Sequence, residues 1–183
     1  MFKLSHNLSE LSESYQLSYT AFINFFKSKK KLTTQDVIIG ANCSYGWMPT
    51  ILDIYSKNLE EETEILNKLK NENEIPSINE LEYLKSTFNN SIVGTSKLMH
   101  FIAPELIPIW DSKVHRKVKK IINVLSNPND VRNFAQYLDL CESIIQDSKF
   151  NKIRKQIHKL GYKDITDMRA IEQLFFLADD KNN

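Results

Sequence analysis

Hydrophobic residues recur at helical spacing along almost the whole chain, and this periodicity is the feature that most constrains the fold. Leu17, Ala21 and Phe25 stand four positions apart, which puts them on one face of a helix. The 183 residues include only 4 Gly and 5 Pro, fewer than the turns of a β-sandwich or barrel require. We therefore predict an all-α, compact multi-helix domain covering residues 1–183.

Charge is distributed unevenly along these helices. Residues 57–85 hold four lysines against eight glutamates, and residues 97–169 hold fourteen Lys and Arg against eight Asp and Glu. An alternative organisation is two helical lobes with a cleft between them, 1–90 with an acidic middle helix and 91–183 as a basic lobe. The basic half suits DNA phosphates. The same charges are equally typical of solvated helix faces, and both interpretations stay open.

Local signals predict where several helices begin and end. Ser77 and Glu80 fit a capping box. A break at Gly46–Pro49 is followed by helical spacing over 50–57. An apolar helix begins just after Gly94 and ends before Pro104, a basic amphipathic helix covers 112–126, and Asn127 with Pro128 opens the next helix.

Other classes of function have no signal in this chain. There is no phosphate-binding glycine loop, dinucleotide fingerprint, serine elbow or metalloprotease helix. His100 and His115 lack partners at metal-ligand spacing, so we expect neither a metal nor another cofactor. Cys43 and Cys141 are interpreted as small core residues of a reducing compartment. With no signal-like or membrane-length apolar run, we expect a cytoplasmic protein.

The stretch IPIWDSKVHRK places Asp111 between an apolar run and a basic helix. As a helix N-cap, Asp111 would contribute about 1 kcal/mol. The apolar neighbours at 106–110 would also give its carboxylate a tunable pKa, which suits a base or a group that stabilises a cation. Upstream, Gly94 precedes a helix start whose free backbone N–H groups suit an anion. Lys97 there is either an ordinary exposed lysine or a reactive one.

The stretches VGTSK and IWDSKVHR resemble two motifs of the helix-hairpin-helix DNA glycosylases of base-excision repair, over about residues 91–118. The resemblance implies a hydrolase that flips a base out of DNA, with Asp111 as the catalytic carboxylate. It also implies that Lys97 is the nucleophile of members with lyase activity, which form a Schiff base. The residues expected to contact DNA are Gly94, Thr95, Ser96, Lys113, Arg116, Lys117 and Lys120.

A second cluster, CSYGWMPTI, gathers aromatic residues around Gly46. It predicts either a core plug at a helix corner or a stacking surface for a base. If a pocket exists, we expect Tyr45, Trp47 and Trp110 to line it.

A non-enzymatic helical module is the competing hypothesis for the whole chain. It would bind nucleic acid or protein, or form a homodimer through its acidic and basic halves, with the polar helix at 59–74 as one contact surface. Under this hypothesis Asp111 is a cap and nothing more.

Overall fold

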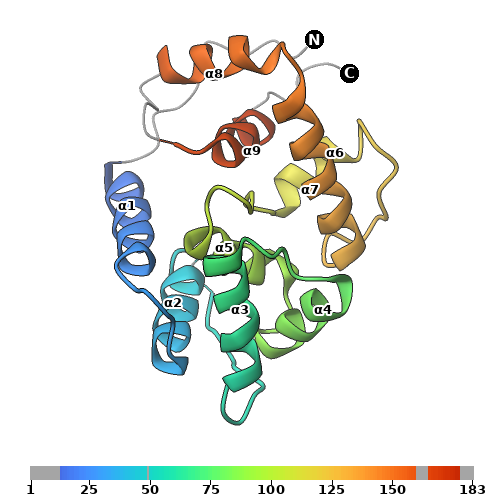
Figure 1. The fold of residues 1–183 in the computed structure, drawn as a ribbon. Coiled ribbons are helices and arrows are strands. Elements are labelled where there is room, and N and C mark those ends of the chain that lie inside the picture. Colours follow the sequence, from blue (N-terminus) through green and yellow to red (C-terminus); the bar gives the residue numbers. More distant parts are fainter. Residues whose placement is uncertain (1–12, 49, 160–164, 178–183) are drawn as a thin grey trace.

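The structure is a computed structural model that describes residues 13–48, 50–159 and 165–177. These residues form helices and no strand (Figure 1), so the all-α prediction is confirmed for this part of the chain. The helices are α1 (Glu13–Lys27), α2 (Thr34–Gly46), α3 (Glu60–Glu72), α4 (Ile78–Thr87), α5 (Ile92–Ile102), α6 (Ser112–Val118), α7 (Val131–Gln146), α8 (Phe150–Lys159) and α9 (Asp167–Leu177).

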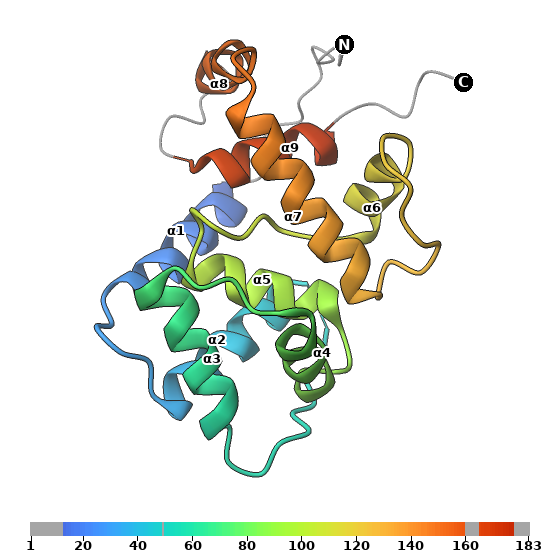
Figure 2. The ribbon, with the colours of Figure 1, turned by 45° about the vertical axis from the view of Figure 1, so that its right-hand side comes forward.

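Helix α5 lies at the centre of the molecule. It contacts α1, α2, α3 and α4, while α9 contacts α6, α7 and α8. In Figures 1 and 2, α2–α4 lie on one side of α5 and α6–α9 on the other. Ten of its residues are buried, as expected for a helix that is apolar on nearly every face. The proposed division into two lobes stays a prediction.

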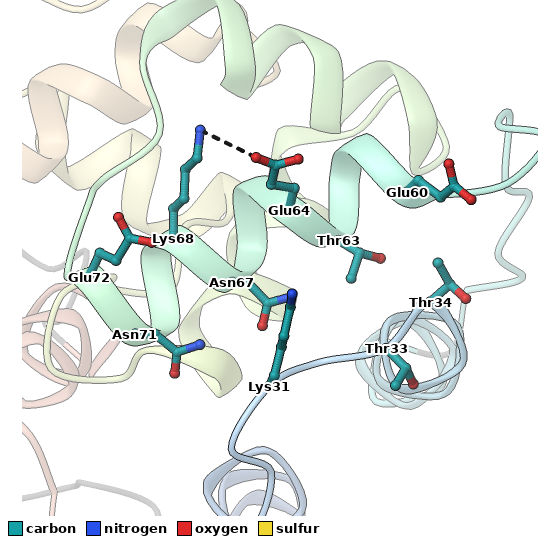
Figure 3. A pocket seen from close by; sticks show the side chains of 10 residues that line it. All are labelled: Lys31, Thr33, Thr34, Glu60, Thr63, Glu64, Asn67, Lys68, Asn71 and Glu72. Carbon is teal, nitrogen blue, oxygen red and sulfur yellow. Dashed lines mark ion pairs between the residues drawn. The ribbon is translucent and has the colours of Figure 1, made fainter.

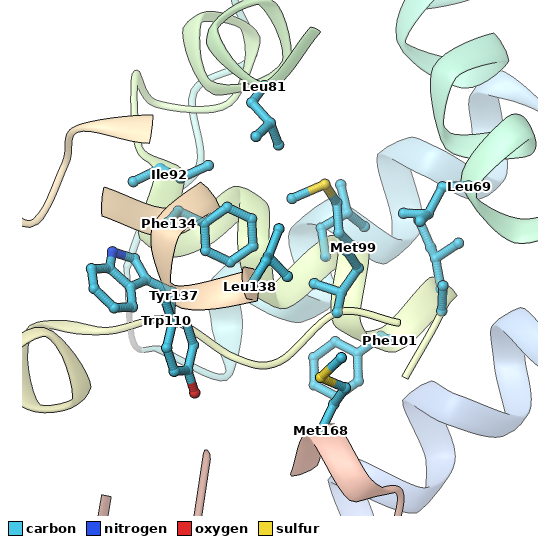
Figure 4. Close-up of a cluster of buried hydrophobic side chains, with 14 of the residues drawn as sticks. Leu69, Leu81, Ile92, Met99, Phe101, Trp110, Phe134, Tyr137, Leu138 and Met168 are labelled. Atoms are coloured by element: carbon cyan, nitrogen blue, oxygen red, sulfur yellow. The ribbon is translucent and has the colours of Figure 1, made fainter. Parts of the chain in front are cut away.

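One hydrophobic core joins the two groups of helices. It extends from Phe26 in α1 to Phe175 in α9. Figure 4 shows its middle, where Met99 of α5 lies among side chains from α7 and from the segment before α6. Trp110 and Tyr137 are fully buried there, with ring centroids 5.0 Å apart.

The helix predicted at 50–57 is wrong. Residues 50–53 are not helical, and Ile54 forms a single antiparallel bridge with Phe88. Asn89 fixes the segment, because its Nδ2 donates to Ile51 O at 2.7 Å and its Oδ1 accepts from Asp53 N. The apolar residues at 50–57 therefore do not form one face of a helix. This segment is held against the α4–α5 turn, and Ile51 is exposed.

Two other predicted boundaries are also wrong. The basic helix ends at Val118, and Asp130, not Asn127, caps α7 through Arg132 N. Within the remainder of the predicted helix, Asn133 bonds both the N–H and the C=O of Leu125, at 2.7 and 3.0 Å, and holds this residue outside a helix. Helix-like spacing beyond 118 could not reveal this tertiary contact.

Other local predictions are confirmed. Ser77 and Glu80 form the expected capping box of α4, and α5 ends at Ile102, two residues before Pro104. Pro49, part of the predicted break, lies outside the described residues.

Candidate functional site

Lys97 lies inside α5 and is buried, with 9% of the residue exposed. Helix α5 begins at Ile92, three residues earlier than predicted, so Lys97 belongs to its second turn. The Lys97 Nζ lies 3.0 Å from the Sδ of Met48, which follows α2. The interpretation of Lys97 as an ordinary exposed lysine is wrong.

Asp111 is the N-cap of α6. Its Oδ1 accepts hydrogen bonds from the N–H groups of Lys113 and Val114, each at 2.8 Å. The cap interpretation is therefore confirmed. Both bonds end on the same oxygen, so capping does not occupy Oδ2, and the side chain is only partly buried.

Two contacts along α5 explain why Lys97 and Asp111, fourteen residues apart, come together. Ser96 Oγ accepts from Trp110 N at 3.2 Å, and one turn later Ile107 O accepts from His100 Nδ1. The segment before α6 thus runs antiparallel to α5, and Trp110, the neighbour of Asp111, is held at Ser96, the neighbour of Lys97. Negative charge on Asp111 acts on Lys97 in this arrangement.

Helix α9 adds a buried ion pair to this site. Arg169 and Glu172, one turn apart, are paired and are 3% and 2% exposed. Gln173 Nε2 donates to Glu172 at 3.2 Å. The start of α9 is held by Thr166, whose Oγ1 donates to Pro104 O at 2.7 Å. Sequence reasoning missed this pair, because Arg and Glu at this spacing are more typical of an exposed helix face.

Lys97, Arg169 and Glu172, which are buried, and Asp111, which is partly buried, form one electrostatic group, which we call the α5–α9 charge cluster. Burial lowers the pKa of Lys97, and the Arg169 cation lowers it further, while the charges of Asp111 and Glu172 oppose the shift. Burial raises the pKa of Glu172 to about 7; Asp111 adds to this shift, and Arg169 and Lys97 oppose it. Both directions follow from the cost of keeping a charge away from water.

His100 borders the cluster as a neutral ring. A carbonyl oxygen only accepts hydrogen bonds, so the contact with Ile107 O places the proton on Nδ1. The Nε2 then accepts from Tyr19 Oη at 2.9 Å. Complete burial lowers the pKa of His100 to about 3, and Arg169, whose guanidinium lies 5.0 Å from the Tyr19 ring centroid, adds to the shift.

The start of α5 differs from the predicted anion site. Gly94 is inside the helix, its N–H is capped by Ser91 Oγ at 3.2 Å, and Asn129 Oδ1 accepts from Ile92 N at 2.8 Å. Thr95 and Ser96 are fully buried. A phosphate reaching these N–H groups would have to displace both side chains. The DNA-contact role of Gly94, Thr95 and Ser96 stays a prediction without support from this geometry.

The four basic residues expected to contact DNA have different surroundings. Arg116 and Lys120 are exposed, whereas Lys117 is buried. The Lys113 Nζ lies 4.2 Å from the centroid of the Phe176 ring on α9, a cation–π contact. Of these four basic residues, Arg116 and Lys120 are the exposed ones.

Of the three aromatic residues expected in a pocket, two are core residues. Trp110 is fully buried and its Nε1 donates to Pro128 O at 2.8 Å. Tyr45 is also buried, and its Oη donates to Phe88 O at 2.7 Å. Trp47 is partly exposed and packs edge-on against Phe101, at 5.2 Å between centroids. The core-plug interpretation suits Tyr45 best.

A hollow on the surface lies away from these aromatic residues, between the start of α2 and α3 (Figure 3). It has a volume of about 730 Å³, and polar side chains line it: Lys31, Thr33, Thr34, Glu60, Thr63, Glu64, Asn67, Lys68, Asn71 and Glu72. Ligand pockets are usually lined mostly by apolar groups. The hollow therefore does not resemble one, and we place the candidate site at the buried charge cluster.

Two further features of the described residues bear on the site. They contain no group of three or more His, Cys, Asp or Glu side chains placed to hold a metal ion. No described helix combines the length and apolar character needed to cross a membrane.

Comparison with protein-family models, curated proteins and solved structures gave no match.

Proposed function

We propose that this chain cleaves the N-glycosidic bond of a base flipped out of DNA, with Lys97 as the nucleophile and Asp111 as its partner. The observation that supports this proposal most is the burial of Lys97 beside Asp111, Arg169 and Glu172. Sequence resemblance to the helix-hairpin-helix glycosylases suggested the Lys97–Asp111 pair before any geometry was considered.

The surroundings of Lys97 favour a nucleophilic amine. A lysine attacks carbon only as the neutral amine, and enzymes obtain that form by desolvation or by a neighbouring cation. Lys97 has both, because it is buried and Arg169 lowers its pKa further. An ordinary surface lysine has neither.

The proposed reaction uses Asp111 and Lys97 on the sugar. As the bond from C1′ to the base breaks, the base leaves with the bonding electrons and takes up a proton. Positive charge develops on the sugar, and the negative carboxylate of Asp111 stabilises it. The lone pair of Lys97 Nζ then forms a bond to C1′, and the nitrogen loses one proton, which balances the proton that the base takes up. The C1′–O4′ bond of the sugar breaks, a second proton moves from the nitrogen to O4′, and the C1′=N bond of the Schiff base forms.

The turn before α5 also agrees with the proposed family. Helices α4 and α5 are joined by residues 88–91 only, a helix–turn–helix outline. Asn89 and Asn90 adopt positive φ, 53° and 49°, the region that glycine usually fills and Asn tolerates. The exposed Arg116 and Lys120 belong to the segment that begins with Asp111, where they would meet phosphates.

Met48 lies against the amine of Lys97. Met48 Sδ contacts the amine, and the long, unbranched Met side chain changes rotamer at low cost. We therefore assign Met48 to the entrance of the proposed site.

A cross-linking experiment tests this function. The full chain is incubated with a duplex containing one abasic site, and borohydride reduces any Schiff base to a stable cross-link. We expect the cross-link to map to Lys97 by peptide mass spectrometry and to be lost in Lys97→Met. Lys57→Met, which removes an exposed lysine outside the proposed site, is the matched control and should cross-link normally. Wild-type protein without a cross-link, or a Lys97→Met variant that retains it, would contradict the proposal.

A non-enzymatic nucleic-acid- or protein-binding module is the second candidate. It is favoured by the two backbone bonds of Asp111, because an N-cap role alone accounts for an acidic residue at this position. Binding of duplex DNA that weakens with salt, combined with no cross-link at Lys97, would favour this module over the enzyme.

A further inference from the structure

The sulfur of Met48 touches the amine of Lys97, and the proposed reaction gives this sulfur no chemistry. The Sδ lies 3.0 Å from the Lys97 Nζ, and a thioether is only a weak hydrogen-bond acceptor. Lys97 is otherwise enclosed, with 9% of the residue exposed. A change in how strongly the Met48 side chain accepts a hydrogen bond therefore acts directly on the amine.

Met48 is also the described methionine that an oxidant in solution reaches most easily. Met99 is fully buried and Met168 is 4% exposed, whereas Met48 is partly exposed. Met1 lies outside the described residues. Oxidation of a methionine to its sulfoxide requires contact between the oxidant and the sulfur, so these differences in exposure favour reaction at Met48.

Hydrogen bonds hold the backbone of Met48 on both sides of the residue. Its N–H donates to Tyr45 O at 3.0 Å, and its C=O accepts from Thr50 Oγ1 at 3.1 Å. Tyr45 belongs to the last turn of α2, and α2 packs against α5, the helix of Lys97. The backbone thus keeps the Met48 side chain within reach of Lys97 after the sulfur has been modified.

We propose that Met48 is a site of reversible oxidation and that its sulfoxide switches off the amine of Lys97. This inference deepens the proposed function, on which its effect on activity rests. Hydrogen peroxide is the oxidant. A lone pair of the Sδ attacks one peroxide oxygen, the O–O bond breaks and an S–O bond forms. The leaving hydroxide takes the proton of the transferred oxygen and departs as water, so the sulfur is oxidised and the peroxide is reduced. A methionine sulfoxide reductase reverses the change.

The sulfoxide oxygen acts on Lys97 through a hydrogen bond. It carries partial negative charge and accepts hydrogen bonds far more strongly than a thioether. Hydrogen bonding to the charged form of a group favours that form, so the oxygen stabilises the Lys97 ammonium, which has no lone pair with which to attack carbon. Hydrogen bonds to charged groups are strong enough to shift such an equilibrium by about tenfold.

Reductive methylation measures the amine without DNA. The full chain is treated with hydrogen peroxide until Met48 is oxidised. Catalase then destroys the peroxide, and a thiol returns any oxidised cysteine to its reduced form. The chain is exposed to ¹³C-formaldehyde and cyanoborohydride near neutral pH, and peptide mass spectrometry measures the modification of Met48 and of Lys97 separately.

We expect Met48 to be oxidised before Met99 and Met168, and Lys97 of the oxidised chain to be methylated about tenfold more slowly. A methionine sulfoxide reductase should restore the rate. Met48→Leu is the matched control, because Leu is similar in volume and cannot be oxidised, and peroxide should leave its Lys97 rate unchanged. Met48→Gln places an amide oxygen near the position of the sulfur and should slow Lys97 without peroxide. An oxidised chain that keeps the rate of the reduced chain would overturn the proposal.

Urea unfolding is a second measurement, and it does not depend on whether formaldehyde reaches Lys97. Oxidation of Met48 should lower the unfolding midpoint more in Lys97→Leu than in wild type, because the variant leaves the sulfoxide oxygen without its partner. Equal losses in the two chains would also overturn the proposal. The proposed function fails separately, because a chain that never cross-links to DNA can still show this coupling. Equal cross-linking before and after oxidation of Met48 refutes only the switch.

Discussion

Replacing Gly94 with alanine tests whether this glycine is needed for helix packing or for an anion. A Cβ at Gly94 would collide with the ring and hydroxyl of Tyr45, whose Cε2 would lie only 2.7 Å away. Tyr45 is 1% exposed and its hydroxyl is bonded to Phe88 O. It cannot move aside without breaking that bond or separating α2 from α5.

The expected cost follows from three contributions. Overpacking of a core costs about 1–3 kcal/mol, and loss of a hydrogen bond to a buried carbonyl costs about 1–3 kcal/mol more. The gain from alanine in a helix interior offsets about 1 kcal/mol. We therefore expect Gly94→Ala to lower the free energy of unfolding by roughly 1–5 kcal/mol, and, at the middle of this range, the midpoint of thermal unfolding by about 10 °C for a chain of this size.

Urea unfolding, followed by circular dichroism, measures this difference. Gly46→Ala is the matched control, because a Cβ there meets nothing within 4 Å, and it should stabilise the protein by up to about 1 kcal/mol. In a Tyr45→Leu background the cost of Gly94→Ala should fall sharply, since the colliding atoms are gone. If Gly94→Ala is as stable as Gly46→Ala, the packing argument is refuted.

Two further predictions concern the charge cluster and its border. Asp111→Ala should cost about 1 kcal/mol through loss of the α6 cap, while Asp111→Asn, which can still cap, should unfold like wild type in urea and lose only the charge-dependent activity. The free energy of unfolding should also depend on pH, and Glu172 and His100 should change it in opposite directions. Glu172 binds its proton more tightly when folded, because its pKa of about 7 exceeds the ordinary 4.5, so its contribution is lost as pH rises between these values. His100, with a pKa of about 3 against 6.5, binds its proton less tightly when folded, so its contribution is lost as pH falls from 6.5 towards 3. Denaturation midpoints should therefore be highest at about pH 4.5–6.5, and His100→Gln should remove the acid limb; a flat profile in wild type would contradict both assignments.

The fold was largely predictable because helical periodicity survives tertiary packing. The segments that became α1, α3, α4, α5 and α7 all carry apolar residues at that spacing. Prediction failed where a side chain distant in sequence determines the backbone. Asn89 holds residues 51–53 outside a helix, and Asn133 bonds the backbone of Leu125 and holds it outside a helix. Neither contact can be recognised from the spacing of apolar residues in the sequence nearby.

The candidate site was predictable only in part. The Lys97–Asp111 pair was suggested by two short motifs, and Ser96 and His100 supply the physical reason that the pair forms. Arg169 and Glu172 could not be found in this way. Their spacing fits a solvent-exposed ion pair, and only the packing of α9 against α6, α7 and α8 reveals that they are buried.

The burial of these charges is itself an argument about function. Apolar residues of similar volume are often as stabilising as a buried ion pair, or more so, so stability alone does not require two cations and two anions beside α5. Perturbed ionisable groups cluster where a protein performs chemistry. The α5–α9 charge cluster combines a lysine with a lowered pKa and a carboxyl that titrates near neutrality. In a protein with only a structural role, that combination would cost free energy without a benefit. An enzyme that needs a neutral amine at physiological pH would use it.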